Sequence, residues 1–246
     1  MSNVEYSVAR LAFEGHDYSK ALSYLQPLAV LGHPKAQHLL GFMYSEGLGV
    51  PRDDAEAERW FRDAAARGLK EAQLELGELC DCCEGAPSDE IEAVEWLSHA
   101  ANHGVKEAQV ALGFKYARGQ GVPHDDAEAL RWFRLAAEQG SNEACVALGF
   151  MHADGRGVPQ DDAEAARWFR IAADRGLKVA QAALGFMYTG GRGVPQDYIQ
   201  ACMWLCVSDV TESGDVRKQL DAIAAKMSPE QMAKAEQLAR DWKPRQ

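Results

Sequence analysis

The chain has 246 residues, of which 47% are hydrophobic and 26% charged, and its formal net charge is −11. This acidic balance argues against a nucleic-acid surface or an anionic-membrane surface, because both need positive charge. No uninterrupted apolar run reaches the length of about 18 residues that a membrane span needs, and residues 1–20 lack the apolar core of a signal peptide, so the expected location is the cytoplasm.

Residues 1–33 are predicted to form a helical hairpin that departs from the pattern of the residues that follow. Ala21 and Gly32 stand 36 residues before Ala57 and Gly68, which occupy the same places in the next repeat. The turn inside this first hairpin is shorter than the later ones. Terminal repeats usually diverge because one of their sides faces solvent.

From residue 34 to residue 213 the chain repeats itself every 36 residues, in five units. Tryptophan, proline and alanine each recur at this step, and so does a leucine–glycine pair, found as Leu40-Gly41, Leu76-Gly77, Leu112-Gly113, Leu148-Gly149 and Leu184-Gly185. A period of this length predicts a stacked helical solenoid, and we expect residues 1–246 to form one elongated domain.

Each unit is predicted to contain two helices, here called helix A and helix B. In the unit Ala108–Gly140 they flank the loop Gly119–Pro123, whose glycines permit a positive φ where helix A ends. The loop has no P-loop lysine and follows no strand, so it is interpreted as a turn and not as a phosphate cradle. Helix B begins with an acidic N-cap and has Glu or Gln three residues later, which predicts a capping box that satisfies amides in both directions. The N-caps are Asp53, Asp89, Asp125, Asp161 and Asp197.

The repeated pattern reads A-x-x-x-L-G-x-x-Y-x-x-G-x-G-V-P-x-D-x-x-x-A-x-x-W-F-x-x-A-A-x-x-G. Over about residues 34–213 it resembles the Sel-one-like repeat family, which is related to the tetratricopeptide repeat. The resemblance implies a right-handed superhelix of antiparallel helix pairs, with helix A on the concave side. It also implies an adaptor role in protein complexes and signalling, while some cysteine-rich secreted members have been described as binding or hydrolysing β-lactams.

Three cysteines, Cys80, Cys82 and Cys83, interrupt the loop of the second unit. They are open to two interpretations, a site for a soft metal or redox sensing, and a drifted loop with free thiols. The nearest histidines, His99 and His103, lie about 20 Å along the helix from this loop. This distance favours the drifted loop, and the chain is predicted to bind no metal and no other cofactor. The histidine pair itself is interpreted as solvated.

The other cysteines, Cys145, Cys202 and Cys206, are predicted to be packing residues. The chain lacks the regular cysteine pair that staples each hairpin in the secreted relatives, which argues against secretion and against their reported activity. After the last repeat, residues 214–246 are predicted to form capping helices over about 215–226 and 229–242. Trp242 is expected to anchor them.

A phenylalanine follows the Leu-Gly pair in four of the five units, and Glu78 takes its place in the second. At about 100° per residue this position faces away from the side on which helix A meets helix B. With residues four positions earlier it forms what we call the aromatic stripe: Phe42, Phe114, Phe150, Phe186, His38, Val110 and Val146. Contiguous exposed apolar surface usually marks a binding site, so the stripe is predicted to bind a partner. The alternative is that each ring packs on the neighbouring helix A and is buried.

The sequence therefore predicts a monomeric adaptor that binds a protein or peptide partner in its concave groove, in bacterial signalling, secretion or toxin immunity. The alternative function is a hydrolase of the β-lactamase-like kind. That chemistry needs an activated nucleophile with a base in reach. The chain contains no Ser-x-x-Lys and no Lys-Thr-Gly, so no catalytic residue is assigned.

Overall fold

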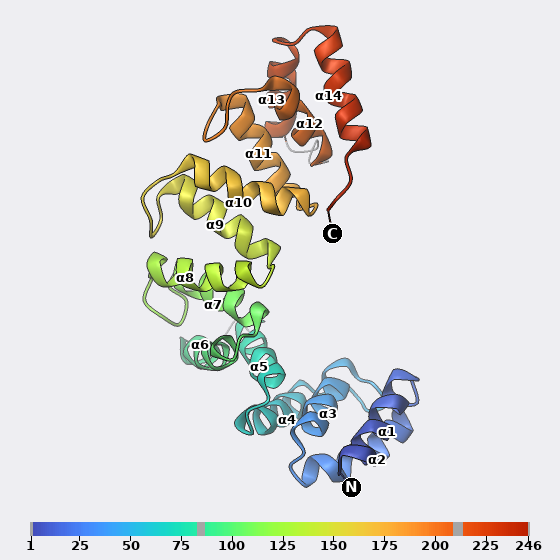
Figure 1. Cartoon of the computed structure of the whole chain (residues 1–246). Helices are drawn as coiled ribbons and strands as arrows, with labels where there is room; N and C mark the ends of the chain where they lie inside the picture. Colours follow the sequence, from blue (N-terminus) through green and yellow to red (C-terminus); the bar gives the residue numbers. More distant parts are fainter. Residues whose placement is uncertain (1, 83–86, 209–213, 246) are drawn as a thin grey trace. The chain divides into compact units, whose positions relative to one another are not determined.

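The structure is a computed structural model that describes residues 2–82, 87–208 and 214–245 (Figure 1). These residues form fourteen helices and no strand. Helices A begin at Pro34, Lys70, Lys106, Asn142 and Lys178. The predicted all-α fold of helix pairs with a period of 36 residues is thereby confirmed.

The chain divides into two units, Met1–His124 and Asp125–Gln246, each with its own packing. The first unit contains α1 (Ser2–Glu14), α2 (Tyr18–Val30), α3 (Pro34–Glu46), α4 (Asp54–Ala66), α5 (Lys70–Cys82), α6 (Pro87–Asn102) and α7 (Lys106–Arg118). The second unit contains α8 (Asp126–Glu138), α9 (Asn142–Asp154), α10 (Asp162–Asp174), α11 (Lys178–Gly190), α12 (Tyr198–Val207), α13 (Gly214–Ala224) and α14 (Pro229–Asp241). None of the described helices combines the length and apolar character needed to cross a membrane.

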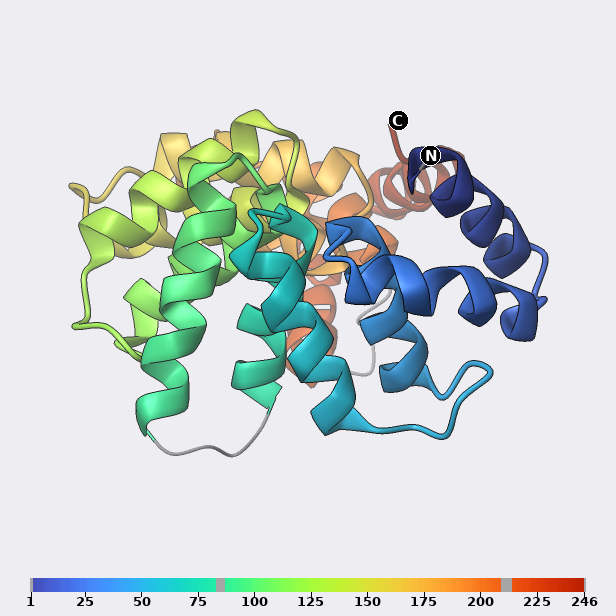
Figure 2. The ribbon, with the colours of Figure 1, turned by 90° about the horizontal axis from the view of Figure 1, so that it is seen from below.

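The first hairpin forms as predicted, with α1 and α2 packed side by side and joined by a short turn (Figure 2). His16 adopts a positive φ of 60° in this turn. Asp17 then caps α2, because its carboxylate accepts a hydrogen bond from the Lys20 amide at 3.1 Å. Figure 2 also shows the longer loop by which the chain leaves α3 and enters α4.

The glycine of each Leu-Gly pair lets the two helices of a hairpin approach closely. A Cβ atom added at Gly149 on α9 would lie 2.6 Å from the Phe169 ring on α10. A Cβ atom added at Gly185 on α11 would lie 2.7 Å from Leu205 on α12. Both distances are too short for real atoms, so the helix pairs require glycine at this position.

The loop after helix A is closed by its glycines and by the predicted N-cap. Gly155 ends α9 in the left-handed region, with a φ of 70°. Asp161 caps α10, because its Oδ1 accepts from the amides of Ala163 at 2.9 Å and Glu164 at 3.0 Å. The same arrangement begins α4, α8 and α12.

The predicted capping box also requires the Glu164 side chain to accept from the Asp161 amide. This part of the prediction is wrong at α10, because the Asp161 amide bonds another group. The Asp161 N–H donates to the His152 carbonyl at 2.9 Å, across the loop from α9. Glu164 pairs instead with Arg167, at 2.6 Å. Of the described helix starts, Ser228 at α14 carries the full reciprocal box with Gln231.

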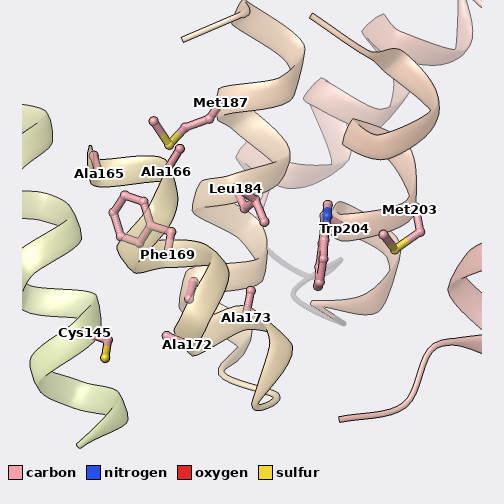
Figure 3. Close-up of a cluster of buried hydrophobic side chains, with 11 residues drawn as sticks. Cys145, Ala165, Ala166, Phe169, Ala172, Ala173, Leu184, Met187, Met203 and Trp204 are labelled. Atoms are coloured by element: carbon pink, nitrogen blue, oxygen red, sulfur yellow. The ribbon is translucent and has the colours of Figure 1, made fainter. Parts of the chain in front are cut away.

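The core of the second unit lies between α9, α10, α11 and α12, and Figure 3 shows its central residues. Phe169 from α10 is 2% exposed, Leu184 from α11 is fully buried, and Trp204 from α12 is 2% exposed. Cys145 from α9 packs in the same cluster, as predicted for a packing residue.

The predicted C-terminal capping helices are present as α13 and α14, within two residues of the expected ends. Trp242 lies beside Trp204, with ring centroids 6.0 Å apart and planes at 68°. It therefore anchors the end of the chain to α12, as expected. Residues 209–213, between α12 and α13, lie outside the described residues.

Candidate protein-interaction site

Two phenylalanines of the aromatic stripe are exposed to solvent. Phe150 on α9 is 43% exposed and Phe186 on α11 is 38% exposed. They occupy the same position in successive repeats of the second unit. The Phe150 ring also stands edge-on to the buried Phe169 ring of α10, with centroids 5.0 Å apart. Phe150 is thus held by one buried neighbour while its other edge stays accessible.

An open pocket of about 230 Å³ lies between these two phenylalanines. Its floor is formed by Phe169 and Met187, and small side chains on helix A, Ala153 and Ala183, leave room for a ligand group. This volume suits one large apolar side chain rather than a drug-sized molecule, whose pockets span roughly 300–1,000 Å³.

The rim of the pocket carries two charges with different environments. Arg192 is paired with Asp162, at 2.8 Å between Nη2 and Oδ1. This ion pair raises the pKa of Arg192, chiefly through the hydrogen bond to Asp162. Asp154 is exposed, and its carboxylate makes no ion pair within the described part of the chain. Asp154 also acts on Arg192 through its charge, so the rim offers an exposed carboxylate close to an arginine that is paired with another residue.

The stripe residues of the first unit make contacts inside that unit. The half-buried Phe42 ring on α3 meets Phe13 of α1 edge-on, with centroids 6.1 Å apart. His38 lies 5.6 Å from the Phe61 ring and 3.9 Å from the Glu75 carboxylate. These side chains join helices to one another, which matches the packing alternative more closely than Phe150 and Phe186 do.

The middle of the stripe is also largely covered. Phe114 is half-buried, and the Arg118 guanidinium lies 5.2 Å from its ring centroid. Val110 is only 8% exposed, and Val146 is partly buried against the core of the second unit. Glu78 stands at the phenylalanine position, and partial burial raises the pKa of its carboxyl group.

Sequence reasoning missed Phe169, Met187 and Asp154 as parts of the site. Phe169 and Met187 read as core residues, and they are core residues whose edges also form a pocket floor. Asp154 lies in the last turn of α9, where the aligned residues of the other repeats are Glu46, Cys82, Arg118 and Gly190. No repeated pattern therefore marked this position.

A larger pocket of about 500 Å³ lies in the first unit, near Tyr6, Arg10 and Arg67. Tyr6 and His33 stack in its wall, with ring centroids 5.1 Å apart. It is more polar and presents no exposed phenylalanine. We therefore centre the candidate site on Phe150 and Phe186.

The predicted thiol loop cannot be placed, because Cys83 and the side chains of Cys80 and Cys82 lie outside the described residues. His99 and His103 are both exposed, as expected for solvated histidines. Within the described part of the chain, no three His, Cys, Asp or Glu side chains group as metal ligands.

Arginines on helix B form ion pairs with acidic residues of the same helix. Arg59 pairs with Glu56 at 2.5 Å, and Arg131 pairs with Glu128 at 2.9 Å. Arg170 differs, since its guanidinium lies over the Tyr188 and Trp204 rings and bonds the Tyr188 hydroxyl.

Two solved structures are similar to this chain over nearly its whole length. The chain is 32% identical to a protective antigen present in uropathogenic Escherichia coli strains, whose structure displays an SLR fold, with a TM-score of 0.87 over 98% of this chain and 53% of that one. It spans about half the length of that protein. It is 28% identical to a Sel1 repeat protein from Oxalobacter formigenes, with a TM-score of 0.82 over 97% of this chain and 100% of that one. No curated protein matched the sequence.

The family model of the Sel1 repeat matches six consecutive segments of the chain. They are residues 6–33, 34–69, 70–105, 106–141, 142–177 and 178–206. The first segment covers the hairpin that the sequence pattern sets apart as degenerate, and the other five follow the 36-residue register. The chain belongs to the Sel1 repeat family.

Proposed function

We propose that the chain is an interaction scaffold that holds a partner polypeptide along its helix A surface, with the pocket between Phe150 and Phe186 as the anchoring point. Sel1 repeat proteins are generally protein–protein interaction scaffolds. The observation that carries the proposal is the pair of exposed phenylalanines on successive helices A, set around an open pocket.

The chemistry of the pocket describes the segment that it would accept. A leucine, methionine or aromatic side chain would lie between the two rings and above Phe169. A lysine or arginine next to it in the partner would reach the exposed Asp154 carboxylate on the rim. The net charge of −11 also favours a basic partner and speeds its approach.

A few well-packed aromatic residues commonly supply most of the binding energy at an interface. Phe150 is already held against Phe169, so little side-chain freedom is lost when a partner binds. We expect each ring to contribute about 2 kcal/mol or more to binding if it lies at the centre of the interface.

We further propose that the protein works as a monomer in the cytoplasm of a bacterium, and that it binds its partner without a cofactor and without catalysis. A signalling adaptor, a secretion adaptor and an immunity protein for a toxin all fit this chemistry. A nitrocefin assay on the purified chain tests the absence of β-lactam hydrolysis, and measurable turnover would contradict it.

The site is tested with peptides selected from a random library for binding to the purified chain. We expect the selected sequences to place a large apolar residue beside Lys or Arg. The double variant Phe150→Ala/Phe186→Ala should bind them at least tenfold more weakly, which corresponds to about 1.4 kcal/mol. Asp154→Asn should weaken only those peptides that carry the basic residue.

Val179→Ala is the matched control, because Val179 is an apolar residue on α11 that is 57% exposed and lies outside the pocket. It should leave peptide binding unchanged. Phe150→Ala should lower the free energy of unfolding by about 1–2 kcal/mol, since its ring is only partly buried, and not by the 3–5 kcal/mol of a core phenylalanine. Peptides that bind the double variant as tightly as the native chain would place the interaction elsewhere.

A further inference from the structure

Three sulfur atoms meet between α12 and α14, outside the candidate interaction site. The Sγ atoms of Cys202 and Cys206, one helical turn apart on α12, are 4.0 Å from each other. The Cys202 Sγ also lies 3.7 Å from the Met232 Sδ on α14. Neither cysteine forms a disulfide. The sequence pattern offered no reason to connect Met232 with these cysteines, since it lies 30 residues after Cys202.

The spacing of these sulfurs matches what a soft metal ion requires. A metal–sulfur bond is about 2.3 Å long, so three sulfurs arranged around one ion in a plane lie about 4.0 Å apart. The two distances in the structure, 4.0 Å and 3.7 Å, are close to this value. Both distances share the Cys202 sulfur, so binding one ion requires the Cys206 and Met232 side chains to turn toward a common point beside it.

We propose that Cys202, Cys206 and Met232 form a three-sulfur binding site for Cu(I). Thiolate and thioether ligands select soft ions such as Cu(I). Zn²⁺ is less suited, because it needs a fourth ligand, and no His, Asp or Glu joins the two thiols as a third metal ligand among the described residues.

The reaction with the ion is balanced without a change of oxidation state. The two Cys S–H bonds break, their protons pass to solvent, and each thiolate forms one bond to Cu(I). Met232 adds its thioether sulfur as a neutral third ligand. The copper enters and remains as Cu(I), so no oxidant or reductant is consumed.

The sulfurs border a buried apolar cluster, and the charge of Glu236 on α14 acts on both cysteines. Cys202 is 3% exposed and belongs to a buried cluster with Leu205, Ile223 and Ala235. Cys206 and Met232 are partly buried and lie at the edge of this cluster. A dry wall behind Cys202 would shield bound Cu(I) from water, and the edge at Cys206 provides the path of entry.

Binding would also connect two elements that are distant in the sequence. Cys202 and Cys206 belong to the last repeat, whereas Met232 belongs to the capping helix α14. An ion held by all three would cross-link the cap to the repeat. Because a ligand that binds only the folded state stabilises it, Cu(I) should raise the melting temperature of the chain.

The test uses the full chain with the changes Cys80→Ser, Cys82→Ser and Cys83→Ser, here called the loop variant, because those thiols would also bind Cu(I). The reduced loop variant is titrated with Cu(I) under anaerobic conditions against bicinchoninate, a Cu(I) chelator. We expect one Cu(I) retained per chain, a rise in melting temperature, and X-ray absorption that shows three sulfur ligands.

Substitutions distinguish the residues that bind the ion from residues that only pack in the core. In the loop variant, Cys206→Ser should abolish stoichiometric retention, and Cys206 is the primary choice because it is not fully buried. Met232→Leu keeps a similar volume, and it should reduce the sulfur count from three to two and weaken binding by about tenfold. Cys145→Ala removes a buried thiol from another cluster and should change nothing.

Circular dichroism of each variant without metal shows whether it is folded, and Cys206→Ala replaces Cys206→Ser if it is not. The proposal is overturned if the loop variant gives up its Cu(I) to the chelator, or if Cys206→Ser retains copper equally well. A sulfur count that Met232→Leu leaves unchanged would remove Met232 from the site. None of these outcomes bears on peptide binding at Phe150 and Phe186.

Discussion

At the scale of single residues, a buried side-chain amide joins four of the repeats to the helix pair before them. The Gln181 side chain on α11 is 1% exposed, and its Nε2 donates to the Ala173 carbonyl in the last turn of α10 at 3.2 Å. The same bond is made by Gln37, Gln73 and Gln109 in the first unit. Cys145 replaces this glutamine in one repeat, where the hydrogen bond is exchanged for apolar packing.

A second residue-scale link between repeats is the ion pair of Arg62 on α4 with Glu92 on α6. Hydrogen bonds from Arg62 and from the Trp96 indole hold the pKa of the Glu92 carboxyl group below its ordinary value. Arg62 also bonds Glu58 on its own helix, at 2.7 Å. Arginine stays protonated throughout the usable range, so the pH response comes from Glu92.

Glu92 gives a prediction about acid stability. Because its pKa is lower in the folded state, its contribution is fully present above the ordinary carboxyl pKa and is lost as the pH falls through the folded value. The pair is partly exposed, so this contribution should be at most about 1 kcal/mol. We expect Glu92→Gln to be less stable than the native chain at pH 6, and the difference to shrink as the pH falls below the ordinary carboxyl pKa, as measured by urea unfolding. A difference that stays constant as the pH is lowered would contradict the assignment.

At the scale of elements, the loop after helix A docks on the start of the preceding helix B. Gly157, the second glycine of its loop, has a φ of 69° and lies against the Asp126 carbonyl at the start of α8. A Cβ atom added there would be 2.5 Å from that oxygen. Arg156 flanks the contact with an ion pair to Asp126 at 2.6 Å. The Gly-x-Gly motif therefore serves two purposes, since its first glycine ends the helix and its second permits docking.

This contact predicts different costs for two glycines with similar backbone angles. Gly157→Ala should destabilise the fold by about 3 kcal/mol, because a methyl group would meet backbone atoms in addition to the unfavourable φ. Gly140 has a φ of 83° and nothing within 4 Å of an added Cβ, so Gly140→Ala should cost only about 1 kcal/mol. Urea unfolding of both variants measures the difference. Equal costs would show that the loop moves away from α8 without penalty.

The sequence predicted the elements well, because their signals are local and repeated. Each of these signals depends only on the backbone conformation of its own unit. They are the Leu-Gly pairs, the loop glycines and the acidic N-caps. The exposure of the stripe could not be predicted in this way, since it depends on what a neighbouring helix presents. Phe42 is covered by Phe13 of the divergent first hairpin, whereas Phe150 leans on Phe169 and leaves an edge free.

At the scale of the whole molecule, a repeat array needs its last apolar surface to be covered. In the second unit this is done by α13 and α14, which pack on α12. Ile223 of α13 is 1% exposed and Ala235 of α14 is fully buried, and both contact the cluster that contains Leu205. Without these helices, α12 would present a contiguous apolar face, which usually leads to association.

This role of the cap predicts how the molecule behaves when the cap is displaced. Ile223→Asp would bury an unpaired carboxylate against Leu205, so it should release α13 and lower the free energy of unfolding by about 4 kcal/mol. The exposed α12 face should then make the variant self-associate, whereas we expect the native chain to be a monomer. Light scattering after size-exclusion chromatography measures the mass of both. Leu238→Asp is the control, because Leu238 is an apolar residue of α14 that is 37% exposed, and it should remain monomeric and stable. If Ile223→Asp also stayed monomeric with an unchanged unfolding midpoint, the stability of α12 would not depend on the cap.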